Sequence, residues 1–134
     1  MLFRSRRGDA ENNTSSYWNT AVGKDSLSSA GAGGLAAQGN TAIGLNSGGA
    51  ITSGDYNTCL GFTAGLNLTT GSGNIMIGDV SAASATGDRQ LMITGYDGST
   101  TTTWISGEST GNTEIAVNWN PSLSTTGKAL VMGF

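Results

Sequence analysis

The chain contains no histidine, a single cysteine and a single proline among its 134 residues. Without histidine, the sequence excludes triads of the Ser-His-Asp type and lacks the side chain that most often binds transition metals. The one cysteine, Cys59, excludes a disulfide framework within the chain. Ordinary disorder is disfavoured as well, because disordered chains are rich in charge and proline, and both are scarce here.

Charged residues make up only 11% of the chain, and the net charge is −3. This balance leaves no broad basic surface, so we expect no nucleic-acid partner. Met1 to Phe3 is too short an apolar run for a signal peptide, and no other segment approaches transmembrane length. We therefore expect synthesis in the cytoplasm and no membrane insertion.

The acidic residues are scattered, mostly at positions expected to be turns. A glycan-cleaving site needs two facing carboxylates, for which Asp55 with Asp88, or Asp79 with Asp97, are the candidate pairs. We favour the interpretation that these aspartates stabilise turns. The sequence accordingly predicts no catalytic residue, no metal site and no cofactor, and we expect that the protein is not an enzyme.

Glycine, in contrast, is abundant at 22 residues, and it closes a repeated pattern. The segments NTAVG, NTAIG, NTCLG and NIMIG align, followed by LMITG, which keeps the glycine but loses the asparagine. The closing glycines are 21, 17, 17 and 17 residues apart. Segments ITSG and LTTG lie between these units, with ATG as a shortened third copy. The repeat-defining residues are Asn19, Gly23, Asn40, Gly44, Asn57, Gly61, Asn74, Gly78 and Gly95.

Each 17-residue unit thus holds two short runs suited to β-strands, each closed by glycine, as expected for one coil of a flattened β-roll or β-solenoid. The asparagines tolerate left-handed turns and, stacked in register, would form a ladder. The extra residues of the first unit, between Ser26 and Gln38, predict a surface loop.

Alternation within the strands predicts two columns on opposite faces, one through Val22, Ile43, Leu60 and Ile77 and the other through Ala21, Ala42, Cys59 and Met76. Both columns are largely apolar, and one thin chain cannot cover both. We expect one column to fill the roll and the other to meet copies of the chain around a threefold axis. Cys59 is then a packed apolar residue rather than a nucleophile. The threonines of the unit also stack, but the column ends at Ile75, which disfavours an ice-binding array.

Three regions follow from this organisation: 1–18 as an N-terminal docking arm or cap, 19–95 as the repeat array, and 96–134 as a small C-terminal β cap or β-prism. The last region is predicted from three alternating segments, 101–106, 113–119 and 129–134.

The repeats NTAVG to NIMIG, with ITSG and LTTG between them, resemble those of phage tail-fibre and related virion proteins, especially of phages that infect cyanobacteria. They are also similar to the head repeats of trimeric autotransporter adhesins. The resemblance covers about residues 19–107. It implies a left-handed parallel β-roll in an intertwined homotrimer, and a non-enzymatic fibre, spike or surface decoration on the virion that contributes to host attachment. Two alternatives stay open: a fragment of a bacterial surface adhesin, and a polysaccharide-degrading tailspike.

Candidate contact residues lie at turns and ends. The cations Arg4, Arg6 and Arg7 would dock the N-terminal arm on other virion proteins, unless this arm is a frayed terminus. Exposed aromatic faces would stack on sugar rings of a host-surface glycan, unless they pack within the cap. These aromatic residues are Tyr56, Tyr96, Trp104 and Trp119.

Overall fold

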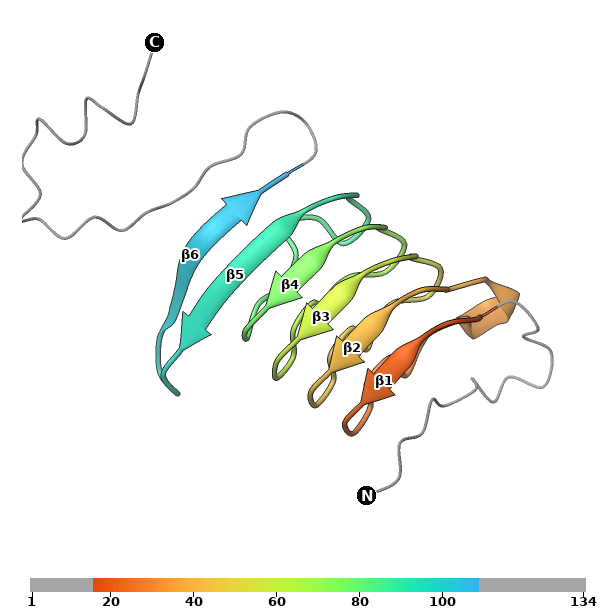
Figure 1. The fold of residues 1–134 in the computed structure, drawn as a ribbon, viewed down its shortest axis with the longest axis horizontal. Helices are drawn as coiled ribbons and strands as arrows, with labels where there is room; N and C mark the ends of the chain where they lie inside the picture. The colour runs from red at the N-terminus through yellow and green to blue at the C-terminus, as the bar shows by residue number, and fades with distance from the viewer. Residues whose placement is uncertain (1–15, 109–134) are drawn as a thin grey trace, which may run out of the picture.

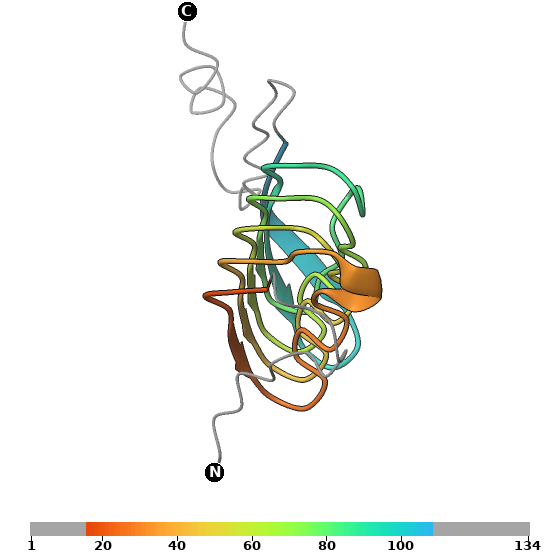
Figure 2. The same ribbon diagram turned by 90° about the vertical axis from the view of Figure 1, so that its right-hand side faces the viewer.

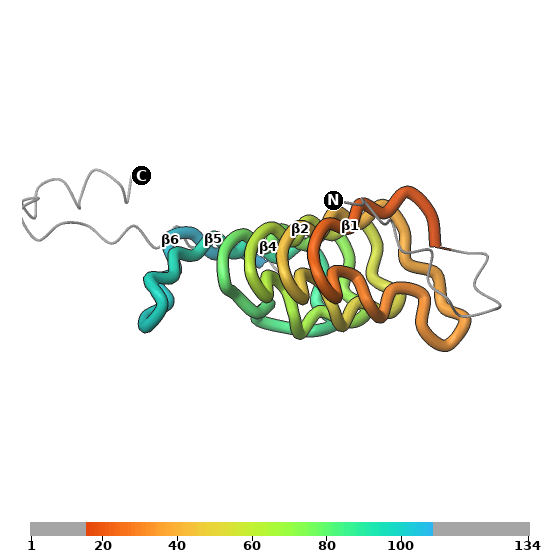
Figure 3. Tube along the Cα trace, turned by 90° about the horizontal axis from the view of Figure 1, so that it is seen from below, coloured from red at the N-terminus to blue at the C-terminus, as the bar shows by residue number. Residues whose placement is uncertain are grey.

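The computed structural model describes residues 16–108, which form one sheet with strand order β1-β2-β3-β4-β5-β6 (Figure 1). After each of the first four strands the chain loops back, so that the next strand lies parallel beside the previous one (Figure 3). This part of the chain is a β-solenoid of about four turns, with about 17 residues per coil. The strands are β1 (Thr20–Val22), β2 (Thr41–Ile43), β3 (Thr58–Leu60), β4 (Ile75–Ile77), β5 (Leu91–Tyr96) and β6 (Thr101–Gly107), the last antiparallel to β5.

The predicted columns are confirmed, and the structure decides which of them faces inward. Ala42, Cys59 and Met76 are paired in register and buried, so their column fills the solenoid. The opposite side of the solenoid contributes Ile51 and Leu68, both fully buried, from the ITSG and LTTG segments. The core is therefore narrow, with one apolar layer from the sheet and one from the return path of each coil.

The expected asparagine ladder runs through the interior of the solenoid. Asn57 Oδ1 accepts hydrogen bonds from the backbone amide and the side-chain amide of Asn74, both at 2.9 Å. Asn57 Nδ2 in turn donates to Asn40 Oδ1 at 3.1 Å and to the Gly71 carbonyl at 2.9 Å. These side chains are buried, and every buried side-chain polar atom of the described residues has a hydrogen-bond partner. The cost of removing the amides from water is therefore offset by hydrogen bonds throughout the ladder.

The left-handed conformation expected of these asparagines belongs instead to the residue before each of them. Trp18, Tyr56 and Arg89 have φ of 60°, 56° and 53°, and Gly39 and Gly73 both have φ of 68°. Placing the left-handed residue before the asparagine directs the amide side chain into the solenoid, where it bonds the neighbouring coil.

A second ladder is made of glycines, and its cause is close approach between backbones. Gly44 has a φ of +133°, and a Cβ at this position would overlap the carbonyl oxygen of Gly61 on the next coil. The ITSG and LTTG glycines behave alike, since a Cβ on Gly54 would overlap the Gly71 carbonyl. Both glycine columns therefore allow successive coils to lie at the spacing that the strands require.

The alignment of the fifth unit was wrong by one residue. Thr94, not Gly95, stacks on Gly78, because Ile93 pairs with Ile77. Gln90 then takes the asparagine position, and its side chain donates to Asn74 Oδ1 at 3.1 Å. Glutamine carries the same terminal amide as asparagine, so the ladder continues into this coil.

Gly95 is required for a different reason. A Cβ at this position would collide with the indole ring of Trp104, which lies in β6 next to the register shift between Ile93 and Thr94. Because residues two apart share a face, this indole lies on the same side of the sheet as Ile93.

The prediction of two strands per coil was wrong, because the ITSG and LTTG segments do not form strands. Each makes only isolated bonds to the next coil, such as Thr52 N to the Thr69 carbonyl at 2.9 Å. The predicted loop of the first unit is present but shorter: Ala32–Gly34 forms an exposed 3₁₀ turn to one side of the coils (Figure 2), while Leu27 and Ala37 are buried.

The alternating segment 101–106 is confirmed as strand β6, which with β5 forms an antiparallel hairpin at the end of the sheet. The expected strands at 113–119 and 129–134 lie outside the described residues, as does most of the 1–18 arm. Left-handedness stays an expectation from the resemblance, and assembly around a threefold axis stays an expectation from the two apolar columns and the resemblance.

Replacing Gly44 by alanine should lower the free energy of unfolding by about 3 kcal/mol or more, because strain at positive φ adds to overlap with the next coil. Gly34 is the matched control: its φ is +77°, but no atom lies within 4 Å of an added Cβ. Gly34→Ala should cost only about 1 kcal/mol. Urea unfolding followed by circular dichroism measures both, and equal losses would contradict the close-approach argument.

Asn57→Ala should lower the free energy of unfolding by about 2–4 kcal/mol, since it leaves the Asn74 amide and the Gly71 carbonyl buried without partners. Asn19→Ala removes a ladder member that is only half-buried, where water can replace the lost bonds, so its effect should be smaller. If thermal and urea unfolding show the two variants to be equally stable, burial of a ladder residue does not increase its contribution to the free energy of unfolding.

Candidate interaction surface

The sheet leaves one broad face outside the solenoid, which we call the outer face. It is formed by the column from Val22 to Ile93 and by the flanking column from Thr20 to Leu91. Ile43, Leu60 and Ile75 are 39%, 44% and 43% exposed, a large fraction for aliphatic side chains in a strand. The full set is Thr20, Val22, Thr41, Ile43, Thr58, Leu60, Ile75, Ile77, Leu91 and Ile93.

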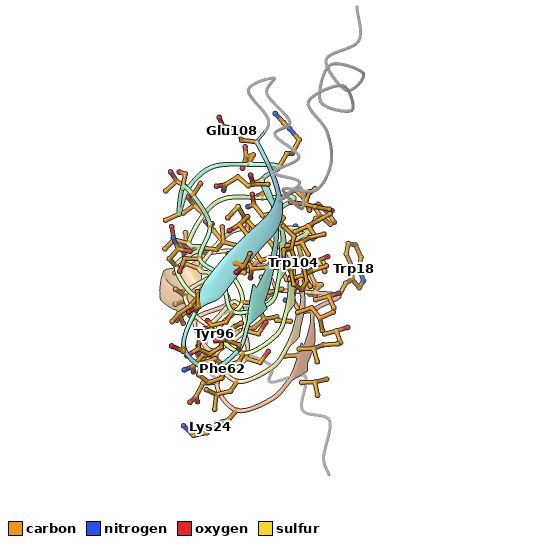
Figure 4. The ribbon with its side chains drawn as sticks, turned by 90° about the vertical axis from the view of Figure 1, so that its left-hand side faces the viewer. Trp18, Lys24, Phe62, Tyr96, Trp104 and Glu108 are labelled. Atoms are coloured by element: carbon orange, nitrogen blue, oxygen red, sulfur yellow. The ribbon has the colours of Figure 1, made fainter. Side chains whose placement is uncertain are left out.

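The outer face contains no charged residue, and it repeats with every coil. Its side chains follow from the strand pattern, because in three-residue strands the first and third residues point away from the core. Trp104, which is 53% exposed, extends the face at the β6 end (Figure 4). An apolar, uncharged strip of this kind is typical of a surface that is covered by another protein surface.

The loops that follow the strands add further exposed apolar side chains. Leu45 and Phe62 occupy equivalent positions after Gly44 and Gly61 and are 37% and 56% exposed. The sequence prediction had not included them, although their position directly after the repeated glycine was a usable signal. In the first coil the same position is Lys24, which pairs with the neighbouring Asp25 at 2.7 Å.

The aspartates bond to the backbone and to hydroxyl groups rather than facing one another. Asp55 Oδ1 accepts the Gln38 amide at 2.8 Å, and Asp88 Oδ1 accepts the Ser72 amide at 2.8 Å. Since the Asp55 backbone amide donates to the Ser72 hydroxyl oxygen at 3.0 Å, the two carboxylates lie two coils apart with a serine between them. The turn-stabilising role predicted for them is confirmed, and the Asp55–Asp88 pair does not form.

The second candidate pair is also separate. Asp79 accepts the hydroxyl of Thr63, whereas Asp97 accepts the amides of Ser99 and Thr100 at 2.8 Å in the β5–β6 turn. These amides lower the pKa of the Asp97 carboxyl. Among residues 16–108, no three His, Cys, Asp or Glu side chains gather where they could hold a metal ion.

The predicted aromatic contact residues do not form one site. Tyr56 lies at a corner before β3, with its ring against Gly39, whereas Tyr96 ends β5 and Trp104 lies in β6. All three are at least half exposed. Trp119 and the cations Arg4, Arg6 and Arg7 lie outside the described residues.

Cys59 is 1% exposed in the inner column, as expected for a packed apolar residue. Burial raises the pKa of its thiol to about 11, because the thiolate would lose its hydration. The thiol is therefore protonated at neutral pH and is a poor nucleophile.

Comparison of the chain with protein-family models, with curated proteins and with solved structures found no match. No helix of the described residues is long and apolar enough to cross a membrane. The class of protein is defined by the fold itself: the chain is a β-solenoid repeat protein with a ladder of buried amides.

The Cys59 thiol should make stability depend on pH in the alkaline range. Its pKa is raised in the folded state, so the unfolded chain loses the proton first as the pH rises. The free energy of unfolding of the wild type should therefore fall relative to that of Cys59→Ala between about pH 8 and about pH 11. Urea titrations of both proteins at each pH measure this difference, and parallel pH profiles would contradict it.

Proposed function

We propose that the chain is a non-enzymatic structural segment of a homotrimeric fibre, spike or surface decoration on a bacteriophage particle, made in the host cytoplasm and carried on the virion. The observation that carries the proposal is the outer face, an uncharged strip of stacked aliphatic and threonine side chains in which Ile43, Leu60 and Ile75 are 39–44% exposed in a single chain. Covering it requires a partner of the same length and the same repeat. A further copy of the chain supplies both.

The narrow core supports the same assembly. A solenoid with three-residue strands buries little apolar area within each coil, so each described coil depends for stability on packing against the next coil along the axis. Burying the outer face against other copies would add roughly 1 kcal/mol for each aliphatic side chain that is now 39–44% exposed and becomes fully buried. The number three, and the left-handed coil, come from the resemblance of the NTAVG-type repeats to virion fibres and adhesin heads.

A rod of stacked coils provides reach, because length grows with the number of repeats while the cross-section stays constant. In this proposal the N-terminal arm with Arg4, Arg6 and Arg7 docks on other virion proteins. Exposed aromatic side chains contribute to contact with the host surface. The bacterial adhesin alternative would use the same outer face on a cell envelope, and the tailspike alternative finds no facing carboxylates among the described aspartates.

The assembly is tested by one substitution on the outer face and a matched one off it. Leu60 is 44% exposed in β3, and Leu35 is 45% exposed in the loop of the first coil. Leu60→Asp should convert the trimer to monomer, because it places a charge against an apolar partner, whereas Leu35→Asp should leave the trimer intact. Light scattering on purified full-length protein gives the mass, and circular dichroism checks that both variants stay folded.

A wild type that is monomeric at all concentrations, or equal behaviour of the two variants, would overturn the proposed assembly. Location is tested separately with antibodies to the chain. Labelling of intact phage particles is expected, whereas a trimer found only in bacterial envelope fractions would favour the adhesin alternative.

A further inference from the structure

A second repeated surface lies where the chain turns into each strand, which we call the entry corner. Two consecutive residues of every coil occupy it, and a backbone bond joins each coil to the next, such as Tyr56 N to the Gln38 carbonyl at 2.9 Å and Gly73 N to the Asp55 carbonyl at 2.8 Å. The corner is therefore as regular as the sheet. Its residue pairs are Tyr17-Trp18, Gln38-Gly39, Asp55-Tyr56, Ser72-Gly73 and Asp88-Arg89.

The second position of these pairs alternates between a large side chain and glycine. The ring of Tyr56 lies over Gly39, with Cδ1 2.5 Å from where a Cβ would be, and Arg89 lies over Gly73, with Cγ at 3.5 Å. A Cβ on Gly39 would overlap the Tyr56 ring, so Tyr56 requires a glycine on the preceding coil, whereas Arg89 is in ordinary van der Waals contact with Gly73. The result is a row in which planar groups recur on every second coil.

The planar groups of this row are open to solvent. Trp18 is 78% exposed and projects from the fold (Figure 4), and Tyr56 is 62% exposed although one side of its ring rests on Gly39. The large side chain of Tyr56 covers the backbone of Gly39, which is a structural reason for a large residue at this position. This reason does not explain the exposed indole of Trp18, which begins the same row.

The spacing of the row points to a ligand. Coils rise by ~4.8 Å, so groups on alternate coils are ~10 Å apart along the solenoid axis. This is close to the length of two units in an extended chain of β-1,4-linked hexopyranoses. The apolar face of a sugar ring stacks on an aromatic ring, and an extended chain of this kind presents the same face at every second unit.

The first position of each pair supplies polar groups beside the row. Asp55 and Asp88 each use one carboxylate oxygen to accept a backbone amide, and the other oxygen has no partner among the described residues. Gln38 adds a side-chain amide on the second coil, and Ser72 adds a hydroxyl on the fourth coil, between the two aspartates. Sugar hydroxyls are hydrogen-bonded by groups of these kinds, so every coil offers a polar contact while every second coil offers a planar one.

We propose that the entry corner binds a linear β-linked polysaccharide that runs parallel to the solenoid axis. Sugar rings two units apart stack on Trp18 and Tyr56, Gln38 bonds hydroxyls of the unit between them, and Asp55 and Ser72 bond hydroxyls beside and beyond Tyr56. The site deepens the host-attachment part of the proposed function by naming its ligand class. It needs no particular oligomeric state, because all of its groups come from one chain.

The experiment measures depletion of the full-length protein from solution by insoluble cellulose and by chitin, with insoluble α-linked starch as the control of chain geometry. Retention on a β-linked polymer is expected, with affinity about tenfold lower in Trp18→Ala and in Tyr56→Ala. Tyr56→Phe should bind like the wild type, since it keeps the ring. Tyr96→Ala is the matched control, because Tyr96 is 50% exposed at the end of β5 and lies away from Trp18 (Figure 4).

Circular dichroism and light scattering on the same samples separate loss of the site from loss of folding or of the trimer. A wild type that stays in solution with both β-linked polymers would overturn the proposal, whatever its mass. So would unchanged binding by Trp18→Ala and Tyr56→Ala, or an equal loss in Tyr96→Ala.

Discussion

The hydrogen bond between buried amide side chains of neighbouring coils is the interaction on which the rest of the structure depends. Strands of three residues form few backbone bonds, so strand pairing alone would specify register weakly. Asn40, Asn57, Asn74 and Gln90 bond along the ladder, and all of them except Asn74 also donate across to backbone carbonyls of the return path. They connect the sheet to the opposite wall of the coil, and a slip of one residue would leave several buried polar groups without partners.

The glycine columns set the other constraint, which is the distance between successive coils. Backbones on successive coils approach more closely than a Cβ would allow, and across each coil the interior holds one apolar layer from the sheet and one from the return path. The sheet has two faces, and only one of them faces the interior of the solenoid. The aliphatic column on the second face is therefore left at the surface of the single chain, and this is the physical origin of the outer face on which the proposed assembly rests.

The same repeat presents two different surfaces, one on the strands and one at the entry corner. On the strands, the side chains that point away from the core are aliphatic or threonine. They form an uncharged strip that another protein surface can cover. At the corner, positive φ at the residue before each asparagine limits the choice to glycine or to a residue whose side chain can lie over a neighbouring glycine. Tyr56 and Arg89, which lie over Gly39 and Gly73, stand two coils apart, and Trp18 stands two coils before Tyr56, a period that suits the proposed polysaccharide. A candidate for assembly and a candidate for ligand binding thus occupy separate parts of each coil.

The sequence by itself determined the solenoid, its period and the membership of both columns, because these depend on local alternation and on glycines at equal spacing. It also predicted the buried role of Cys59 and the turn-stabilising role of Asp55 and Asp88. Tertiary structure alone decided that the Ala42 column faces inward and that the last coil has one residue fewer, with Gln90 in place of asparagine. It also brought Trp18 into line with Tyr56. These features depend on where the chain returns after each turn, which is set by hydrogen bonds between residues about 17 positions apart, and no local pattern encodes them.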